Sequence, residues 1–183
     1  MDFRLAPQPN ELTWLAPRGG PNAKTKTAAA TFQGKKIVIQ SPECATRMFK
    51  DTNSTTLYLE LDQSEIHQQF ATWIESYESF VETNVQLGTA AKSTSLRNGS
   101  LRLMVWDDAQ WFDASGTFLK EAPGVVKRCA CAMEFLGCWV SDRSWGLKWR
   151  VAQIQVMPPL ETDAPPRFAA ATAAPARGYA FHE

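Results

Sequence analysis

The sequence predicts a mainly β domain of the α+β class, a small β-barrel with one inserted amphipathic helix and a long C-terminal β-hairpin. Three features of the 183-residue chain lead to this prediction. Short segments of alternating polarity recur along it, one segment has helical periodicity, and residues 124–158 have the pattern of two long strands around a polar turn. A β-sandwich with a helix packed on one end is the alternative.

The predicted terminal hairpin is the longest of these features. Its strands run from about residue 127 to 140 and from about 146 to 157, with Ser-Asp-Arg-Ser at the turn. In the second strand the apolar positions change face midway, from 147, 149 and 151 to 152, 154 and 156. Such a change requires a bulge, and small barrels bend their strands in this way. Gly137 is expected to have a similar role in the first strand.

Other strands are predicted before the hairpin. Residues 31–40 have the pattern of a strand pair with Gly34-Lys35 at its turn, and residues 56–61 alternate leucines with other residues. Residues 100–106 point positions 101, 103 and 105 inward, and Arg102, Met104 and Trp106 outward. A turn at 107–108 and a short hairpin over 110–120 are expected to follow.

Residues 64–85 are predicted to form the helix. From Ile66 to Val81, apolar residues recur at intervals of three and four, the spacing of one helix face. Trp73 and Tyr77 lie on this stripe and are assigned to packing. His67 lies off the stripe and is expected at the surface. The solvent side of the helix carries four glutamates at 65, 75, 78 and 82.

Composition divides the chain into three parts. Residues 1–27 are rich in turn-forming residues, which predicts a flexible N-terminal arm with a candidate first strand at 11–15. Residues 28–157 hold the predicted strands and helix. An OB-fold, the commonest small barrel of nucleic-acid-binding proteins, accounts for this order of elements, so we expect an OB-like domain there. Residues 158–183 are rich in Pro and Ala and are expected to form a disordered tail.

The net charge is zero, but charge is segregated along the chain. Residues 1–50 hold eight Lys and Arg against three Asp and Glu, residues 51–91 hold seven acids and no Lys or Arg, and residues 92–157 hold nine bases against six acids. This distribution favours a basic face opposite an acidic one. No segment has the length and polarity of a signal peptide or membrane span, so we expect a soluble, intracellular protein with no membrane contact.

The sequence contains no catalytic constellation. It has two histidines, no glycine-rich phosphate loop and no nucleophile motif, so no enzyme is predicted. The aspartates at 107, 108 and 113 are better explained as turn residues than as a metal nuclease. The four cysteines at 44, 129, 131 and 138 lack the spacing of a zinc site and are expected to be buried, reduced thiols. We therefore predict neither a metal nor a cofactor.

Aromatic and cationic side chains gather at the terminal hairpin and on outward strand faces. Single-stranded nucleic acid requires this combination, because bases stack on rings and phosphates pair with cations. Packing in the core is the alternative for each tryptophan, and it is favoured for Trp149. The predicted stacking residues are Trp106, Trp111, Phe112, Trp139 and Trp145. The predicted cationic contacts are Lys35, Lys36, Arg102, Lys127, Arg128, Arg143, Lys148 and Arg150.

Two parts of the chain also resemble a known family. Phe32-Gln-Gly-Lys-Lys-Ile-Val-Ile-Gln-Ser-Pro42, followed by Met48-Phe49 and Leu57-Tyr-Leu-Glu-Leu61, resembles the front half of a protein family of nucleocytoplasmic large DNA viruses, in which a GK…QTP element precedes a strand and a helix. Gly137-Cys-Trp139 and Trp145-Gly-Leu-Lys-Trp-Arg-Val-Ala-Gln153 resemble its closing hairpin. The resemblance spans residues 12–157 in order.

More distantly, the hairpin is similar to the end of the barrel in T7-type phage single-strand-binding proteins. Those proteins carry a strongly acidic tail that ends in an aromatic residue. Here the acids at 161, 163 and 183 are offset by Arg167 and Arg177, so this tail departs from that pattern.

The resemblance implies a non-catalytic OB-fold protein that binds single-stranded DNA in viral DNA replication, recombination or repair, at the site of viral replication in the host cell. Single-stranded DNA is then the expected partner, with RNA as the second ligand class. Replication proteins are expected to dock on the C-terminal tail, and an oligomer is compatible with the pattern. The alternative is a structural or adaptor protein of a virion or replication complex that uses an OB-like scaffold.

Overall fold

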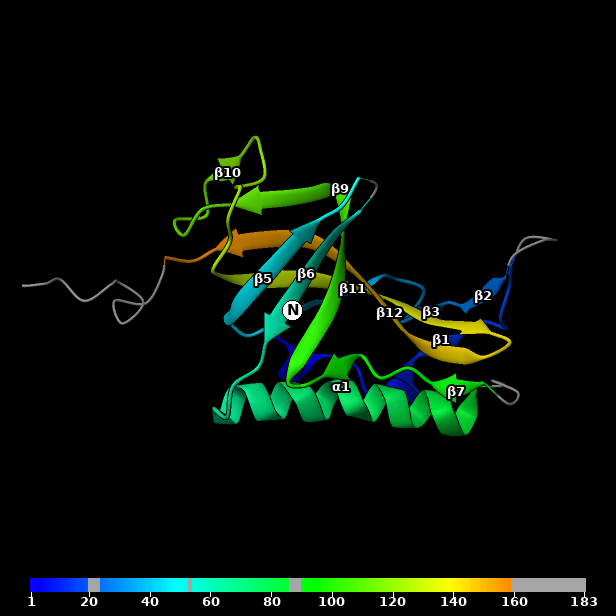
Figure 1. Cartoon of the computed structure of the whole chain (residues 1–183). Coiled ribbons are helices and arrows are strands. Elements are labelled where there is room, and N and C mark those ends of the chain that lie inside the picture. The colour runs from blue at the N-terminus through cyan, green and yellow to red at the C-terminus, as the bar shows by residue number, and fades with distance from the viewer. Residues whose placement is uncertain (20–23, 53, 86–89, 159–183) are drawn as a thin grey trace, which may run out of the picture.

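The computed structural model describes residues 1–19, 24–52, 54–85 and 90–158, and the predicted tail from residue 159 onward lies outside them. Figure 1 shows a barrel of long strands with one helix across its lower end. The elements in chain order are the 3-10 helices Phe3–Leu5 and Pro9–Glu11, strands β1 (Thr13–Trp14), β2 (Thr25–Ala28), β3 (Ala30–Thr31), β4 (Ile37–Gln40), β5 (Cys44–Lys50) and β6 (Thr55–Glu60), helix α1 (Glu65–Asn84), and strands β7 (Ala91–Lys92), β8 (Leu96–Arg97), β9 (Ser100–Phe112), β10 (Phe118–Leu119), β11 (Arg128–Ser141) and β12 (Ser144–Val156).

Five strands form a closed ring. β5 pairs with β6, β6 with β9, β9 with β12, β12 with β11, and β11 returns to β5. All these pairings are antiparallel except that of β9 with β12, which is parallel. The last barrel strand in the chain therefore lies between the third and the fourth, a Greek-key closure that makes the fold OB-like. The predicted barrel with one helix is confirmed, and the sandwich alternative is wrong.

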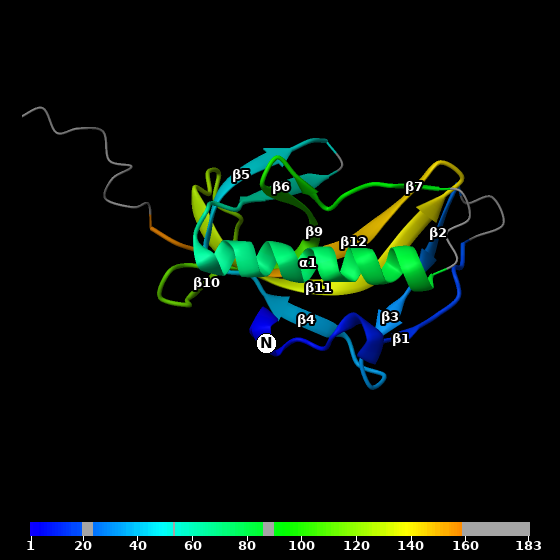
Figure 2. The same ribbon diagram turned by 90° about the horizontal axis from the view of Figure 1, so that it is seen from below.

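Helix α1 closes one end of the barrel with an aromatic cluster. Its buried face packs Trp73 against Trp149 and Tyr77 against Phe135, with ring centroids 5.7 and 5.0 Å apart. Figure 2, seen from the helix side, shows α1 crossing in front of β11 and β12, which carry these partners. The predicted helix and the packing role of Trp73 and Tyr77 are confirmed. In the described part of the chain, no helix combines the length and hydrophobicity needed to span a membrane.

The surface position predicted for His67 is wrong. Its side chain is buried, with Nδ1 2.7 Å from the Asp62 carboxylate and Nε2 2.9 Å from the Glu43 carbonyl oxygen. A histidine ring is stable inside a protein when both of its nitrogens have hydrogen-bond partners. The spacing of apolar residues gives no information about such partners. Ile66, which the periodicity places on the buried stripe, is 40 % exposed instead.

The N-terminal residues pack on the helix, which differs from the flexible arm expected for residues 1–27. Phe3 and Leu12 are buried, and the Phe3 ring lies 5.1 Å from the Phe70 ring. The Tyr77 hydroxyl donates a 2.5 Å hydrogen bond to the Pro7 carbonyl. The turn-forming residues let this segment run along α1, and the buried side chains of Phe3 and Leu12 hold it in place. The division of the chain at residues 27 and 157 stays a prediction.

Two strands depart from the sequence prediction: one was not predicted, and the other is longer than predicted. The sequence pattern does not predict β5, although this strand is the first strand of the barrel. The turn predicted at residues 107–108 is wrong, because β9 continues through them to Phe112. It leaves β6 after Val105 and pairs onward with β12 and β10. Both aspartates of the pair are exposed. They lie where the register with β12 shifts, since Val105 pairs with Val151 and Gln110 with Gln153, so strict alternation does not apply to them.

The predicted pair over residues 31–40 is also only partly correct. A tight turn is present, but Gln33 and Gly34 occupy its centre, both at positive φ, and Phe32 and Lys35 exchange backbone hydrogen bonds of 3.1 and 2.9 Å. The flanking strands do not pair with each other. β3 pairs with β1, and β4 pairs with β11.

The predicted bends in the terminal hairpin are present. The register between β11 and β12 shifts after Ala132 and again between Phe135 and Gly137, so the extra residues turn the strand around the barrel. Gly137 has φ +108°, and a Cβ there would lie 2.0 Å from the Ala28 carbonyl oxygen. Only glycine lets β2 approach this bend.

Replacing Gly137 with alanine is therefore expected to lower the free energy of unfolding by about 2 kcal/mol or more, through backbone strain and displacement of β2. Urea denaturation of the full chain measures this effect. Gly124→Ala is the matched control, because no atom lies within 4 Å of its added Cβ. Equal stability of the two variants would contradict the role given to Gly137.

Candidate nucleic-acid interface

Three neighbouring barrel strands present aromatic and cationic side chains outward. The register places Tyr58 of β6 between Arg47 of β5 and Arg102 of β9. One step along, Phe49 and Met104 flank Thr56 in the same way. We call these outward side chains the outer face; its members are Arg47, Phe49, Tyr58, Arg102, Met104 and Trp106. β6 and β9 are the second and third barrel strands, whose face binds oligonucleotides in OB-folds.

The aromatic rings and the Met104 side chain of the outer face are accessible. Phe49 is 57 % exposed, Met104 43 % and Trp106 42 %, whereas large apolar side chains are usually buried. The Phe49 ring meets Tyr58 edge to face at 5.6 Å, and the Arg47 guanidinium lies 6.0 Å from the centre of the Tyr58 ring. Arg47 also pairs with Glu60 at 2.5 Å, so part of its charge is compensated. The face thus offers stacking surface with moderate positive charge.

A groove of about 330 Å³ adjoins the outer face, where the tip of the terminal hairpin meets residues 93–95. Arg102 and Met104 belong to both the outer face and this groove. Its lining residues are Thr25, Ser93, Thr94, Ser95, Arg102, Met104, Trp139, Leu147, Lys148 and Trp149. These described lining residues include two cations, four hydroxyl groups and no carboxylate. Figure 1 shows β7, which precedes residues 93–95, at the hairpin tip beside the C-terminal end of α1.

Gly146 brings the walls of the groove together. Trp139 lies opposite Gly146 in the hairpin, and a Cβ on the glycine would come within 3.0 Å of the indole Nε1 and 2.9 Å of the Ser93 carbonyl oxygen. The indole therefore rests on the bare backbone of β12. The Ser93 N–H donates to the Trp145 carbonyl at 2.7 Å, which fixes the opposite wall to the same strand.

An ion cluster borders the outer face further along β12, next to the groove. Glu134 has only 5 % of its side chain exposed and accepts from Arg150 Nη2 at 2.6 Å, while Lys36 Nζ lies 3.2 Å from its other oxygen. Arg150 Nη1 also donates to Asp108 at 3.1 Å. The Arg150 guanidinium lies 4.9 Å from the centre of the Trp106 ring. Arg150 thus supports one face of Trp106 by a cation–π contact.

The structure divides the predicted stacking residues. Trp106 is exposed, Trp139 is half-buried in the groove wall, and Phe112 is half-buried beside Phe118. Trp111 and Trp145 are corrections, since they are 7 % and 2 % exposed and have no free ring for a base. Both point inward because alternation along a strand sends every second side chain into the barrel. Trp149 is buried against Phe135, as predicted.

The predicted cations divide by their partners. Lys36 and Arg150 pair with Glu134, and Arg128 pairs with Glu43, so carboxylates compensate part of the charge of these three predicted phosphate contacts. Among the described residues, no carboxylate pairs with Arg102 or Lys148. The remaining candidates do not line the groove: Lys35 lies in the turn before β4, Lys127 before β11, and Arg143 at the hairpin tip. The groove brings together Arg102, Trp139 and Lys148, and Trp106 lies on the adjoining outer face.

Sequence reasoning misses Arg47 and Phe49 as interface residues. Both lie on β5, which the pattern does not predict, so their outward direction is not visible in the sequence. In the structure, buried Cys44 and Thr46 alternate with exposed Ala45 and Arg47, but the polarity of these four residues does not alternate in the same way.

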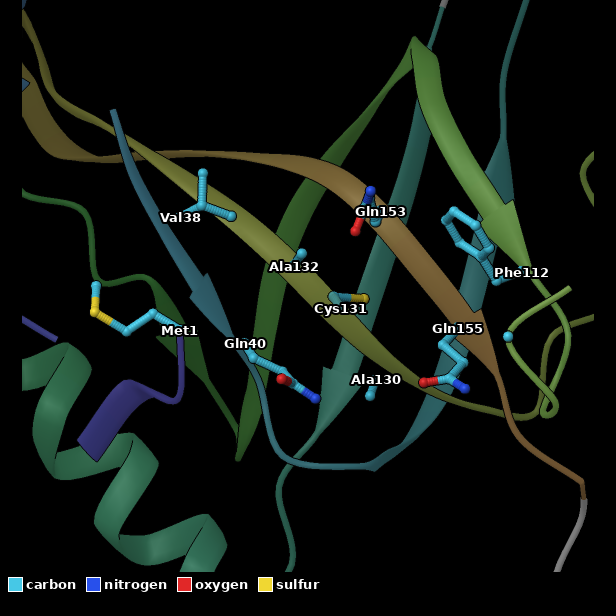
Figure 3. A pocket seen from close by; sticks show the side chains of 10 residues that line it. Met1, Val38, Gln40, Phe112, Ala130, Cys131, Ala132, Gln153 and Gln155 are labelled. Atoms are coloured by element: carbon cyan, nitrogen blue, oxygen red, sulfur yellow. The ribbon is translucent and has the colours of Figure 1, made fainter. Parts of the chain in front are cut away.

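A second depression, the trough, lies across β4, β11 and β12 and has a volume of about 390 Å³. Figure 3 shows its floor at Ala130 and Ala132 with Gln153 and Gln155 along one side. None of the side chains of the described residues that line it is charged. Because cationic side chains make the strongest contacts to phosphates, the outer face and the groove are the better candidate interface.

Cys44, His67 and Asp62 lie in the order of a nucleophile, a base and an orienting acid. Cys44 Sγ is 3.6 Å from His67 Nε2, and Nδ1 is 2.7 Å from Asp62. Burial raises the pKa of the Cys44 thiol to about 12, which disfavours the thiolate form that attacks substrates. Among the described residues no group of three or more His, Cys, Asp and Glu is placed to hold a metal ion.

Comparison with known proteins finds similarity only among solved structures. No protein-family model matches the chain, and no curated protein has a matching sequence. The crystal structure of gp2.5, a single-stranded DNA binding protein encoded by bacteriophage T7, is 12 % identical with a TM-score of 0.46, covering 81 % of this chain and 100 % of that one. A C-terminally truncated single-stranded DNA-binding protein from bacteriophage Enc34 is 8 % identical with a TM-score of 0.48, covering 80 % of this chain and 96 % of that one.

The ion cluster leads to a stability prediction. Glu134→Ala is expected to lower the free energy of unfolding by about 3 kcal/mol, because it leaves the partly buried Arg150 without its main partner. Glu60→Ala removes a pair whose carboxylate is 40 % exposed, and is expected to cost less than about 1 kcal/mol. Urea denaturation compares the two, and equal losses would show that Glu134 is not a buried anchor.

The thiols lead to a second prediction. Burial raises the pKa of Cys138 to about 11, and the pKa of Cys131 is also raised, by its contact with Cys129 and by burial. At pH 8 the native chain should therefore resist Ellman's reagent, while the chain unfolded in guanidinium reacts at all four thiols. Rapid reaction of a native thiol that is lost in Cys44→Ser would restore Cys44 as a candidate nucleophile.

Proposed function

We propose that this chain is a non-catalytic single-stranded DNA-binding protein, with the outer face and the groove as its interface. One observation carries the proposal. Arg102, Met104 and Trp106 alternate outward on β9, so an unpaired cation stands beside two accessible apolar surfaces on the binding strands of an OB-like barrel. Bases stack on such rings while the cation pairs with the backbone.

The balance of forces favours single strands over duplexes. The chain has no net charge, and several of its candidate cations are engaged by carboxylates. Phosphate neutralisation, which governs duplex binding, is therefore weak here. Stacking contributes about 1–3 kcal/mol per base, and it requires base faces that a duplex conceals. A single-stranded nucleic acid can gain both phosphate pairing and base stacking on the outer face.

The sequence resemblance to a family of large DNA viruses supports a place in viral DNA replication, recombination or repair. It also puts DNA before RNA as the ligand, although RNA presents the same bases and phosphates to stacking rings. Recruitment of replication proteins by the C-terminal tail and self-association belong to the same proposal.

A second candidate is an adaptor protein on an OB-like scaffold. The exposed side of α1 supports it, because Glu65, Glu75 and Glu82 form an acidic surface there. Glu78, also expected on that side, is buried instead. An adaptor would bind a basic partner through α1 and leave oligonucleotides unbound.

Substitution of Trp106 tests the proposed function. Trp106→Ala is expected to weaken binding of an unstructured thymidine oligomer by about tenfold or more, since one stacking partner is lost. Fluorescence anisotropy of a labelled oligomer measures the affinity at two salt concentrations. Phe118→Ala is the matched control, because Phe118 is 56 % exposed but lies on β10, outside the outer face.

With Arg102 and Lys148 as phosphate contacts, affinity should fall by about 1.4 log units for each log unit of salt. Equal binding by both variants would remove the outer face as the interface. Absence of binding at low salt would favour the adaptor.

A further inference from the structure

The groove has the chemistry of an anion site joined to an apolar surface. Arg102 and Lys148 reach it from the adjacent strands β9 and β12, and no carboxylate among the described residues pairs with either cation. Elsewhere on this side of the barrel, Arg47, Arg150 and Lys36 are each bound to an acid. Two unpaired cations at one depression leave positive charge for a ligand to compensate.

Hydroxyl groups form the wall opposite these cations. Ser93, Thr94 and Thr25 line the groove, and no hydrogen bond within the described ranges engages their hydroxyls. Hydroxyl and cationic donors together suit the oxygen atoms of a phosphate. An apolar peptide would leave these donors without partners, which is unfavourable.

Helix α1 holds this wall in place. The buried Glu78 carboxylate accepts from the Ser95 N–H at 2.5 Å and lies 3.5 Å from Lys92 Nζ. On the other side, the Ser93 N–H is bonded to β12 at Trp145. The wall is thus attached at both ends, which holds the spacing between its hydroxyls and the two cations before any ligand arrives.

We propose that the groove is a subsite for one nucleotide of a single strand. Arg102, Lys148 and the hydroxyl wall bind its phosphate, and Trp139 with Met104 contacts its base. The volume of about 330 Å³ is at the lower end for small-molecule pockets and suits one nucleotide rather than several. The trough, which is of similar size, has no cationic side chain among its described lining residues.

This inference deepens the proposed function and rests on it, so its test separates the two. The full chain is titrated with a thymidine oligomer by anisotropy. Lys148→Gln and Arg102→Gln are each expected to weaken binding about tenfold at low salt and to reduce the salt slope by about 0.7. Thr94→Val should weaken binding about threefold with the slope unchanged, because no charge is lost. Lys120→Gln, an exposed cation after β10, is the matched control.

A second titration uses thymidine 5′-monophosphate, thymidine and inorganic phosphate with the ¹⁵N-labelled chain. We expect the monophosphate to shift the indole N–H resonance of Trp139, assigned with Trp139→Phe, and thymidine to shift it far less. The Arg102→Gln variant should lose the shift. An equal shift from inorganic phosphate alone would mean a simple anion site and would overturn the nucleotide subsite.

The outcomes distinguish the two proposals. Oligomer binding that survives Lys148→Gln and Arg102→Gln but not Trp106→Ala overturns the subsite and leaves the proposed function intact. Absence of any oligomer binding overturns the proposed function, and the monophosphate titration then decides the subsite independently.

Discussion

The parallel pairing of β9 with β12 is the interaction on which the rest of the structure depends. It joins the middle of the chain to its last strand and closes the ring that begins at β5. It also sets Arg150 beside Met104 and Val151 beside Val105, so one register fixes both the outward row and the core beneath it. Parallel neighbours require a long connection between them. Here that connection includes β11, and the tip of the hairpin that β11 forms with β12 lies at the groove.

The interior and the surface of the barrel are linked through the aromatic cluster under α1. Trp149 packs against Phe135 and Trp73 inside, while its neighbours Lys148 and Arg150 point outward. Fixing the tryptophan therefore fixes the direction of both cations. The helix acts on the groove a second time through Glu78, whose carboxylate holds residues 93–95. A single helix thus supports the core and positions one wall of the candidate site.

Charge pairing decides which cations remain for a ligand. The sequence contains a surplus of bases in residues 92–157, but the fold brings acids from distant strands to several of them. Glu134 holds Arg150 and Lys36, and Glu43 holds Arg128. An exposed pair contributes little to stability, yet it still lowers the charge available to a phosphate. Arg150 is left with a different role, as support for Trp106.

The sequence by itself determined the barrel class, the helix, the long hairpin with its bends, and the outward row Arg102, Met104 and Trp106. These follow from periodicity and glycine placement, which are local. The tertiary structure alone decided that Trp111 and Trp145 are buried, that His67 lies inside, and that β5 completes the ring. It also decided which cations are paired. Burial and ion pairing depend on side chains brought together from distant segments, and no local pattern records those distances.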